Sequence, residues 1–177
     1  EVTRGLCAGR TGPITVSTLR DAEYFARYGF RDIVYAVGIA PQKLERVGAL
    51  RAAGADVCVL LDSAEQAHAV PAAARQTGDR LPALIELDAD GHRAGLRPDD
   101  PRIVEIAAML RDGGAEPRGV LVHAGESYQC RTPDELERAA ENERMTAVSA
   151  AAVLRDAGFA APVVSVGSTP TALGARD

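Results

Sequence analysis

The sequence predicts an α/β fold in which parallel strands alternate with helices, and three observations support this prediction. Apolar segments of strand length alternate with amphipathic segments of helix length along the whole chain. The strand segments are continuous apolar runs, such as DVCVLL at 56–61, which indicates burial on both faces of a parallel sheet. The helical segments end at glycine, for example Gly54 and Gly78, a common C-terminal signal.

The predicted elements follow one another without a linker. Strands are expected at 13–17, 32–37, 56–61, 81–87, 118–122 and 162–166, and helices after each of the first five. Ser63 with Gln66, and Thr132 with Glu135, have the spacing of capping boxes that open two of the helices.

Six β/α units fit either a doubly wound sheet or most of a TIM barrel. The first strand is not followed by a GxGxxG motif, which disfavours a dinucleotide-binding doubly wound sheet. Six units are two short of a closed barrel, and the chain begins at Glu1 rather than Met. We therefore predict a TIM-barrel-like (β/α) domain over residues 1–177 that is incomplete and lacks the first and last strands.

Composition excludes several classes of protein. The chain has 177 residues and a net charge of −5, without the basic clusters of a nucleic-acid-binding surface. It has no apolar stretch long enough to span a membrane and no signal-peptide pattern, so no membrane partner is expected. Cys7, Cys58 and Cys130 form no C-x-x-C pair, which argues against a disulfide framework and favours a reducing cytoplasm. Lys43 is the single lysine.

The segment at 164–171 is the clearest candidate for a binding site. An apolar run opens into Gly167, Ser168, Thr169 and Pro170 at the predicted end of a strand. Glycine allows close approach of the backbone to a ligand, and the two hydroxyls add donors for an anion. The same residues are also typical of an ordinary turn, and the sequence alone does not separate the two interpretations.

Three more residues lie where strands of a barrel end, the usual place of the active site. Arg93 lies in a glycine-containing loop and could bind a phenolate or carboxylate, or it could pair with Asp88 or Asp90 at the surface. His123 could donate to a ring nitrogen or transfer a proton, and it could equally be a core histidine. Tyr128 could contact a cofactor or cap the core.

The remaining polar candidates are assigned structural roles. We expect Lys43 to be a solvated surface lysine in a first helical turn, His68 to be structural within a helix, and His92 to be exposed. Asp62 with Ser63 is interpreted first as a helix cap. The histidines do not have the spacing of metal ligands, so no metal site is predicted within the chain.

Four segments resemble the D-threonine aldolase and D-serine dehydratase group. These are fold-type III pyridoxal-phosphate (PLP) enzymes related to the N-terminal barrel of alanine racemase. Residues 13–34 resemble the second and third barrel strands of the group, and 85–95 its strand with the arginine that contacts the cofactor ring oxygen. Residues 119–128 resemble its next strand end, with a ring-side contact, and 164–171 its phosphate-binding turn.

The resemblance implies that Arg93, His123 or Tyr128, Gly167, Ser168 and Thr169 bind PLP. It implies a cytoplasmic, homodimeric lyase on D-3-hydroxy amino acids, acting by retro-aldol cleavage or by β-elimination. In this group the Schiff-base lysine precedes the matched region, and a C-terminal β-domain carries a divalent metal (zinc or manganese). Neither has a counterpart in residues 1–177, so the chain alone is expected to be an inactive fragment.

Alternative functions remain open from the sequence. The chain could be a non-catalytic homologue that binds PLP or phosphate, or an amino-acid racemase of the same fold. It could also be an unrelated barrel enzyme on phosphorylated metabolites, with Glu86 or Asp88 as the acid or base. A barrel that lacks two strands exposes strand edges, so self-association of the isolated chain is expected.

Overall fold

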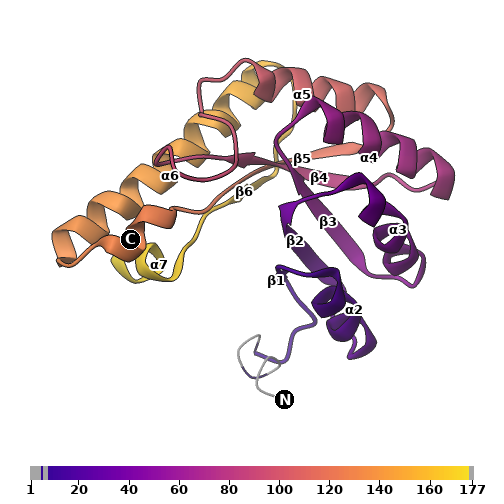
Figure 1. Cartoon of the computed structure of the whole chain (residues 1–177), viewed down its shortest axis with the longest axis horizontal. Helices are drawn as coiled ribbons and strands as arrows, with labels where there is room; N and C mark the ends of the chain where they lie inside the picture. Colours follow the sequence, from indigo (N-terminus) through magenta and orange to yellow (C-terminus); the bar gives the residue numbers. More distant parts are fainter. Residues whose placement is uncertain (1–4, 6–7, 176–177) are drawn as a thin grey trace.

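Six parallel strands form one sheet in the order β1-β2-β3-β4-β5-β6 in the computed structural model (Figure 1), which describes residue 5 and residues 8–175. The strands are β1 (Ile14–Val16), β2 (Asp32–Gly38), β3 (Asp56–Leu61), β4 (Pro82–Leu87), β5 (Glu116–Val122) and β6 (Val163–Ser165). The helices are α2 (Leu19–Arg27), α3 (Leu44–Ala52), α4 (Ala64–Thr77), α5 (Arg102–Asp112), α6 (Pro133–Asp156) and α7 (Thr169–Gly174). Short 3₁₀ turns occupy Pro41–Lys43 and Gly125–Gln129.

The helices α2 to α6 follow one another along the outer side of the sheet, and the sheet curls as an incomplete barrel (Figure 1). The main core lies between the helices and the outward side chains of the strands, such as Ile33, Val59 and Ile85. Alternate side chains of the same strands form a second, smaller cluster. Its buried members are Cys58, Leu60, Leu84 and Leu121, which are the inward side chains of β3, β4 and β5.

The prediction that strands are buried on both faces is confirmed in the middle of the sheet. Every residue of β4 and all but the first of β3 are buried. β1 and β6 are the outer strands of the sheet. They have three residues each and are only partly buried. β5 starts at Glu116 rather than at the predicted residue 118, because Glu116 and Pro117 also pair with β4. Within the described residues no helix is both long and apolar enough to cross a membrane.

Helix ends agree with the expected capping chemistry. Ser63 with Gln66 and Thr132 with Glu135 form the predicted capping boxes. A third box, Ser168 with Thr171, opens α7, a helix that the sequence interpretation treated only as part of a turn.

The amino-terminal ends of the strands together form one border of the sheet, called here its amino-terminal edge. This edge carries a network of ion pairs. Arg118 of β5 bridges Asp56 at 2.8 Å and Glu116 at 3.1 Å, and Arg51 of α3 bridges Asp56 and Asp79. Burial works to raise the pKa of Asp56, but the bonds and charges of Arg118 and Arg51 outweigh it and hold that pKa below its ordinary value. The network therefore ties the starts of β3 and β5 to the end of α3 and to the segment after α4.

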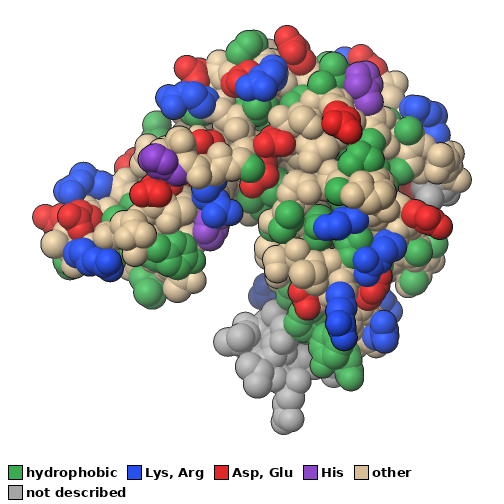
Figure 2. Space-filling model, viewed as in Figure 1, with side chains coloured by type: hydrophobic (Ala, Val, Ile, Leu, Met, Phe, Trp, Pro, Cys, Tyr) green, Lys and Arg blue, Asp and Glu red, His purple; other side chains and the backbone are tan. Residues whose placement is uncertain are grey.

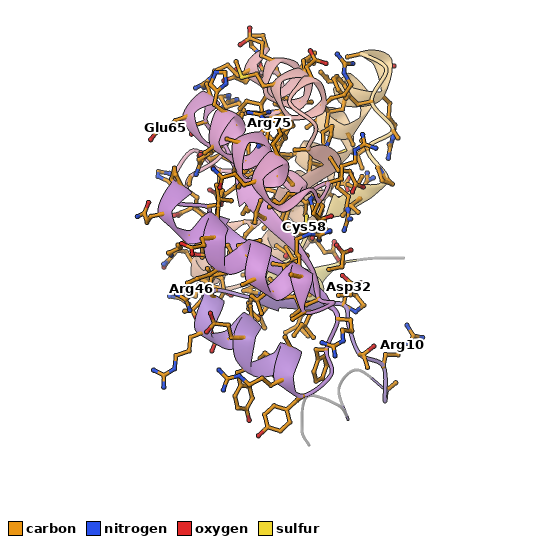
Figure 3. The ribbon with its side chains drawn as sticks, turned by 90° about the vertical axis from the view of Figure 1, so that its right-hand side faces the viewer. Arg10, Asp32, Arg46, Cys58, Glu65 and Arg75 are labelled. Atoms are coloured by element: carbon orange, nitrogen blue, oxygen red, sulfur yellow. The ribbon has the colours of Figure 1, made fainter. Side chains whose placement is uncertain are left out.

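The amino-terminal edge and the carboxyl-terminal edge, which the carboxyl ends of the strands form, lie on opposite sides of the molecule. Figure 3 shows Asp32, at the start of β2, on one side, and Glu65, in the first turn of α4, on the other. Because α4 follows the carboxyl end of β3, Glu65 marks the carboxyl-terminal edge. All strands are parallel, so the residues directly after each strand lie at this second edge.

Candidate functional site

A cavity of about 500 Å³ opens at the carboxyl-terminal edge of the sheet. Residues of β1, β2, β4, β5 and the end of β6 line it, so the first and last strands face the same space and the cavity lies inside the curl of the sheet. Figure 2 shows that the molecule is hollowed between the limb of α6 and α7 and the part that contains β1 and α2. The lining includes the polar side chains of Glu86, Arg93, His123 and Ser165 and the backbone of Gly167.

Arg93 lines this cavity from the loop between β4 and α5. Its side chain crosses Gly125, where a Cβ atom would come within 2.6 Å of Arg93 Cδ, so glycine makes room for the arginine. Among the described residues Arg93 forms no ion pair with Asp88 or Asp90, whose carboxylates instead accept bonds from backbone amides of the surrounding loops. The arrangement favours a ligand-facing arginine over a surface pair.

His123 faces the cavity from the end of β5. Its Nδ1 lies 3.1 Å from the carbonyl oxygen of Gly167. A carbonyl oxygen only accepts, so Nδ1 is the donor in this contact. Tyr128 is half exposed and stacks on His123 with ring centroids 6.0 Å apart, and it is not part of the cavity lining. His123 therefore faces the cavity, whereas Tyr128 packs against His123 from outside the lining.

The turn after β6 presents backbone groups, and the hydroxyl of Ser168 is used within the chain. Gly167 is exposed and has a φ of +143°, with open space where a Cβ would stand. Ser168 is buried, its hydroxyl caps α7, and its amide donates to Thr171 Oγ1 at 3.0 Å. This corrects the expectation that the Ser168 hydroxyl is a free donor, because the first turn of α7 already uses it. Thr169 is exposed, and its amide, at the start of the helix, has no partner within that helix.

Glu86 of β4 is the most buried carboxylate in the cavity wall, with 9% of its surface exposed. Burial raises its pKa, the carboxylates of Asp62 and Asp88 raise it further, and Arg93 opposes the change. Among the described residues none donates a hydrogen bond to the Glu86 carboxyl group. The acidic group is thus available to a ligand or to water.

Lys43 is not the solvated surface residue that the sequence suggested. It ends the 3₁₀ turn Pro41–Lys43, and its Nζ donates to the hydroxyl of Tyr35 at 2.8 Å. Tyr35 is fully buried and points into the core on the helix side of the sheet, whereas the next residue, Ala36, lines the cavity. The single lysine therefore lies on the wrong side of β2 to reach a ligand in the cavity.

The other candidates have structural positions. The side chains of His68 and His92 are exposed and do not line the cavity. Asp62 accepts a bond from the amide of Gly95 at 2.9 Å and so fixes the loop that carries Arg93. Cys7 lies outside the described residues, and Cys58 and Cys130 are free. Among the described residues no three histidine, cysteine or acidic side chains are grouped as a metal site would require.

Sequence reasoning missed a buried polar cluster behind the site. Ser127, Glu143 and Thr171 are all at most 2% exposed. The hydroxyls of Ser127 and Thr171 hydrogen-bond to that of Ser168, and the Thr171 hydroxyl donates to Glu143. The Ser-x-x-Thr spacing of residues 168–171 was an available signal for a capped helix. Nothing in the polar stretch around Glu143 distinguishes this residue from its exposed neighbours, so only the packing of α6 reveals it.

These features define a class: a barrel-type α/β domain with a small-molecule site at the carboxyl ends of its strands. Comparison with known proteins makes the class specific. The family model described as alanine racemase, N-terminal domain, matches residues 1–177, and the chain belongs to this family, whose enzymes are fold-type III PLP proteins. Membership excludes the alternative of an unrelated barrel enzyme.

Individual relatives agree with this assignment. The chain is 49% identical over 169 residues to D-threo-3-hydroxyaspartate dehydratase from Delftia sp., which is 95% of this chain and 44% of that enzyme. A solved structure of that dehydratase superposes with a TM-score of 0.95 at 47% identity, over 98% of this chain and 46% of the other.

Two further relatives differ in length. D-threonine aldolase from Arthrobacter sp. is 30% identical over 172 residues, which is 96% of this chain and 44% of the aldolase. An uncharacterized protein of Mycobacterium tuberculosis is 32% identical over 160 residues, which is 89% of this chain and 90% of that protein. The chain therefore spans less than half the length of the dehydratase and the aldolase, and most of the mycobacterial protein.

Proposed function

We propose that the protein containing this chain is a PLP-dependent lyase on D-3-hydroxy amino acids, of the dehydratase type. The observation that carries the proposal is the convergence of Arg93, His123 and Gly167 on one cavity at the carboxyl ends of the strands. Identity of 49% to a D-threo-3-hydroxyaspartate dehydratase, against 30% to a D-threonine aldolase, favours β-elimination over retro-aldol cleavage.

The residues of the cavity fit the non-covalent part of a PLP site. A volume of about 500 Å³ is within the usual range for small-molecule pockets. The exposed backbone at Gly167 and Thr169 suits a phosphate, and the Arg93 guanidinium suits the anionic oxygen on the ring. His123 offers Nε2 beside the ring, with its orientation fixed by the bond from Nδ1 to the Gly167 carbonyl.

In such enzymes the cofactor ring acts as an electron sink for the carbanion that forms at the substrate Cα. The residues of this chain bind and orient: Gly167 and Thr169 at the phosphate, Arg93 at the ring oxygen and His123 beside the ring. The apolar side chains of Ala36 and Leu121, which belong to the inner cluster of the sheet, line the same cavity.

Other parts of the site lie outside residues 1–177 in this proposal. Lys43 is bonded to Tyr35 on the far side of β2, so the covalent anchor is another lysine of the complete protein. A divalent metal, zinc or manganese, is proposed for a C-terminal β-domain of the complete protein, as the resemblance to the D-threonine aldolase and D-serine dehydratase group implies. Residues 1–177 then form part of a PLP-binding barrel, inactive alone, within a cytoplasmic homodimer.

The test of this proposal is product analysis with the complete protein. D-threo-3-hydroxyaspartate, D-serine and D-threonine are supplied separately with PLP and with zinc or manganese. Release of ammonia and a keto acid supports the dehydratase, whereas release of glycine and an aldehyde moves the assignment to the aldolase. Racemisation without either product contradicts the lyase and supports a racemase of the same fold.

A non-catalytic PLP-binding homologue is the second candidate, because one specific observation favours it. The mycobacterial relative is matched over 90% of its length, so a protein about as long as this chain exists within the family. For this candidate we expect reversible PLP binding by residues 1–177, without turnover and without a covalent bond to Lys43.

A further inference from the structure

Glu86 is a buried carboxyl group that faces the cavity and has no donor among the described residues. Its neighbours on β4, Ile85 and Leu87, belong to the core on the helix side, so the alternation of the strand turns Glu86 inward. Only 9% of its surface is exposed. In the same part of the chain, the fully buried side-chain oxygen without a partner is Asp90 Oδ1, so the oxygens of Glu86 open into the cavity. A buried acceptor without a donor destabilises the fold, and a ligand that donates to it removes this cost.

The loop that carries Arg93 returns to the backbone of Glu86. The amide of Leu96 donates to the Glu86 carbonyl at 2.9 Å, and the Leu96 carbonyl accepts from the amide of Asp88 at 2.9 Å. Gly95 has a φ of +115° and packs so closely on β4 that a Cβ would come within 2.5 Å of a backbone carbon. The loop is therefore fixed on the end of β4, and Arg93 and Glu86 belong to one part of the cavity wall.

The charges around Glu86 favour a cationic group of the ligand. Burial raises the pKa of Glu86, the carboxylates of Asp62 and Asp88 add to this change, and Arg93 opposes it. Three acidic groups thus share this region with one guanidinium, and they stay unbalanced when the guanidinium binds an anion. In either protonation state a carboxyl group has an oxygen that accepts a hydrogen bond, so an amine or ammonium donor is the matching group.

The chemistry of PLP indicates which amine can reach Glu86. The ring oxygen assigned to Arg93 and the 4′ group are attached to adjacent carbons of the ring. The 4′ carbon is the position at which the amino group of a substrate becomes attached. A nitrogen at this position therefore lies beside the group that Arg93 binds, next to the part of the wall that contains Glu86.

We propose that Glu86 is the subsite for the amino group of the substrate, from which it accepts a hydrogen bond while Arg93 binds the neighbouring ring oxygen. This subsite rests on the PLP-binding function proposed above and adds recognition of the amine to it. The end of β4 then has two roles, since its loop binds an anion and its strand binds a cation. A residue that only oriented Arg93 would instead act equally on every ligand that has the ring oxygen.

The test compares two ligands that differ only at the 4′ carbon: PLP has an aldehyde there, and pyridoxamine phosphate has an amine. Both are titrated into residues 1–177, and binding is measured by equilibrium dialysis. Glu86→Leu removes both acceptor oxygens, so the affinity for pyridoxamine phosphate falls at least about tenfold, whereas the affinity for PLP does not fall. Glu86→Gln retains one acceptor oxygen, so it loses about threefold, again for pyridoxamine phosphate alone.

The matched control is Glu105→Leu, which changes an exposed glutamate of α5 and leaves both affinities unchanged. Equal losses for the two ligands in Glu86→Leu, or no loss for either, overturn the amine subsite while the PLP site itself stands. Binding of neither ligand by the wild-type chain contradicts the proposed function and the subsite together. If urea denaturation shows that Glu86→Leu does not fold, the ratio of the two affinities in the nearly isosteric Glu86→Gln decides.

Discussion

The two edges of the sheet use the same kinds of residue in different ways. At the amino-terminal edge Arg51, Asp56 and Arg118 each have oppositely charged partners within the chain. At the carboxyl-terminal edge Glu86 and Arg93 line a cavity, and neither forms an ion pair with another of the described residues. The difference teaches that a satisfied network at one edge stabilises the fold, whereas incompletely satisfied groups at the other are available to a ligand.

The largest expected effect is a loss of stability when the ion pairs of the amino-terminal edge are broken. Arg118→Met leaves Asp56 and Glu116 without one of their partners, so the free energy of unfolding falls by about 1–3 kcal/mol in urea denaturation. PLP affinity of the folded variant is unchanged, because the network is at the opposite edge. Arg102→Ala, in an exposed pair with Asp100, is the control and costs less than about 0.5 kcal/mol. Loss of PLP affinity in Arg118→Met would contradict the separation of the two edges.

Lowering the pH is also expected to remove the stability that the ion pairs of Asp56 contribute at the amino-terminal edge. The pKa of Asp56 is lowered in the fold, so its stabilising contribution is present above the ordinary aspartate pKa and is lost as pH falls through the lowered value. Wild type therefore loses about 1 kcal/mol more stability than Asp56→Asn between about pH 6 and pH 3. Equal losses in urea denaturation at the two pH values would show that the Asp56 pairs contribute nothing.

At the carboxyl-terminal edge, Glu86→Gln is expected to have a smaller effect of opposite sign: it raises the stability of the fold. The pKa of Glu86 is raised, so its contribution to stability is full at low pH and is lost as pH rises through the raised value. The variant is expected to be more stable than wild type by less than about 1 kcal/mol near pH 8, with a smaller gain near pH 4. The contrary result is a stability difference, variant minus wild type, that is smaller near pH 8 than near pH 4. It would mean that the cavity stabilises the Glu86 carboxylate.

The smallest expected effect concerns Lys43. Lys43→Arg leaves PLP affinity unchanged within about twofold, because Lys43 is bonded to Tyr35 on the helix side of β2. Borohydride treatment of the wild-type chain with PLP, followed by mass spectrometry of its peptides, should find no cofactor attached to Lys43. A reduced adduct at that residue would place the lysine in the cavity and contradict the structure.

Much of the fold was predictable, because local signals and global fold agree. Continuous apolar runs predicted β3 and β4, and capping boxes located the starts of α4 and α6. The sequence also located the loops that carry Arg93 and His123, since strand ends of a parallel sheet meet at one edge. These signals depend on residues within a few positions of one another.

The errors concern contacts between distant segments. Lys43 looked solvated because its partner, Tyr35, lies across a strand end and belongs to the core. The Ser168 hydroxyl was expected to be free because residues 168–171 were interpreted as a turn, although their Ser-x-x-Thr spacing also fits the capped start of α7. Glu143 received no role because its bonds reach 19 and 28 residues along the chain. A single sequence contains no periodic signal for such contacts.

The central claim is that the carboxyl-terminal edge is a PLP site in which Arg93 is a ligand contact. The most direct measurement is the PLP affinity of residues 1–177 in three proteins: wild type, Arg93→Ala and Arg97→Ala. Each is titrated with PLP, and binding is measured by absorbance or by equilibrium dialysis. We predict that Arg93→Ala weakens binding at least about tenfold at unchanged stability. Arg97→Ala, in a neighbouring exposed pair with Asp99, should bind as wild type. Equal affinities of all three proteins, or no binding by any, would contradict the claim.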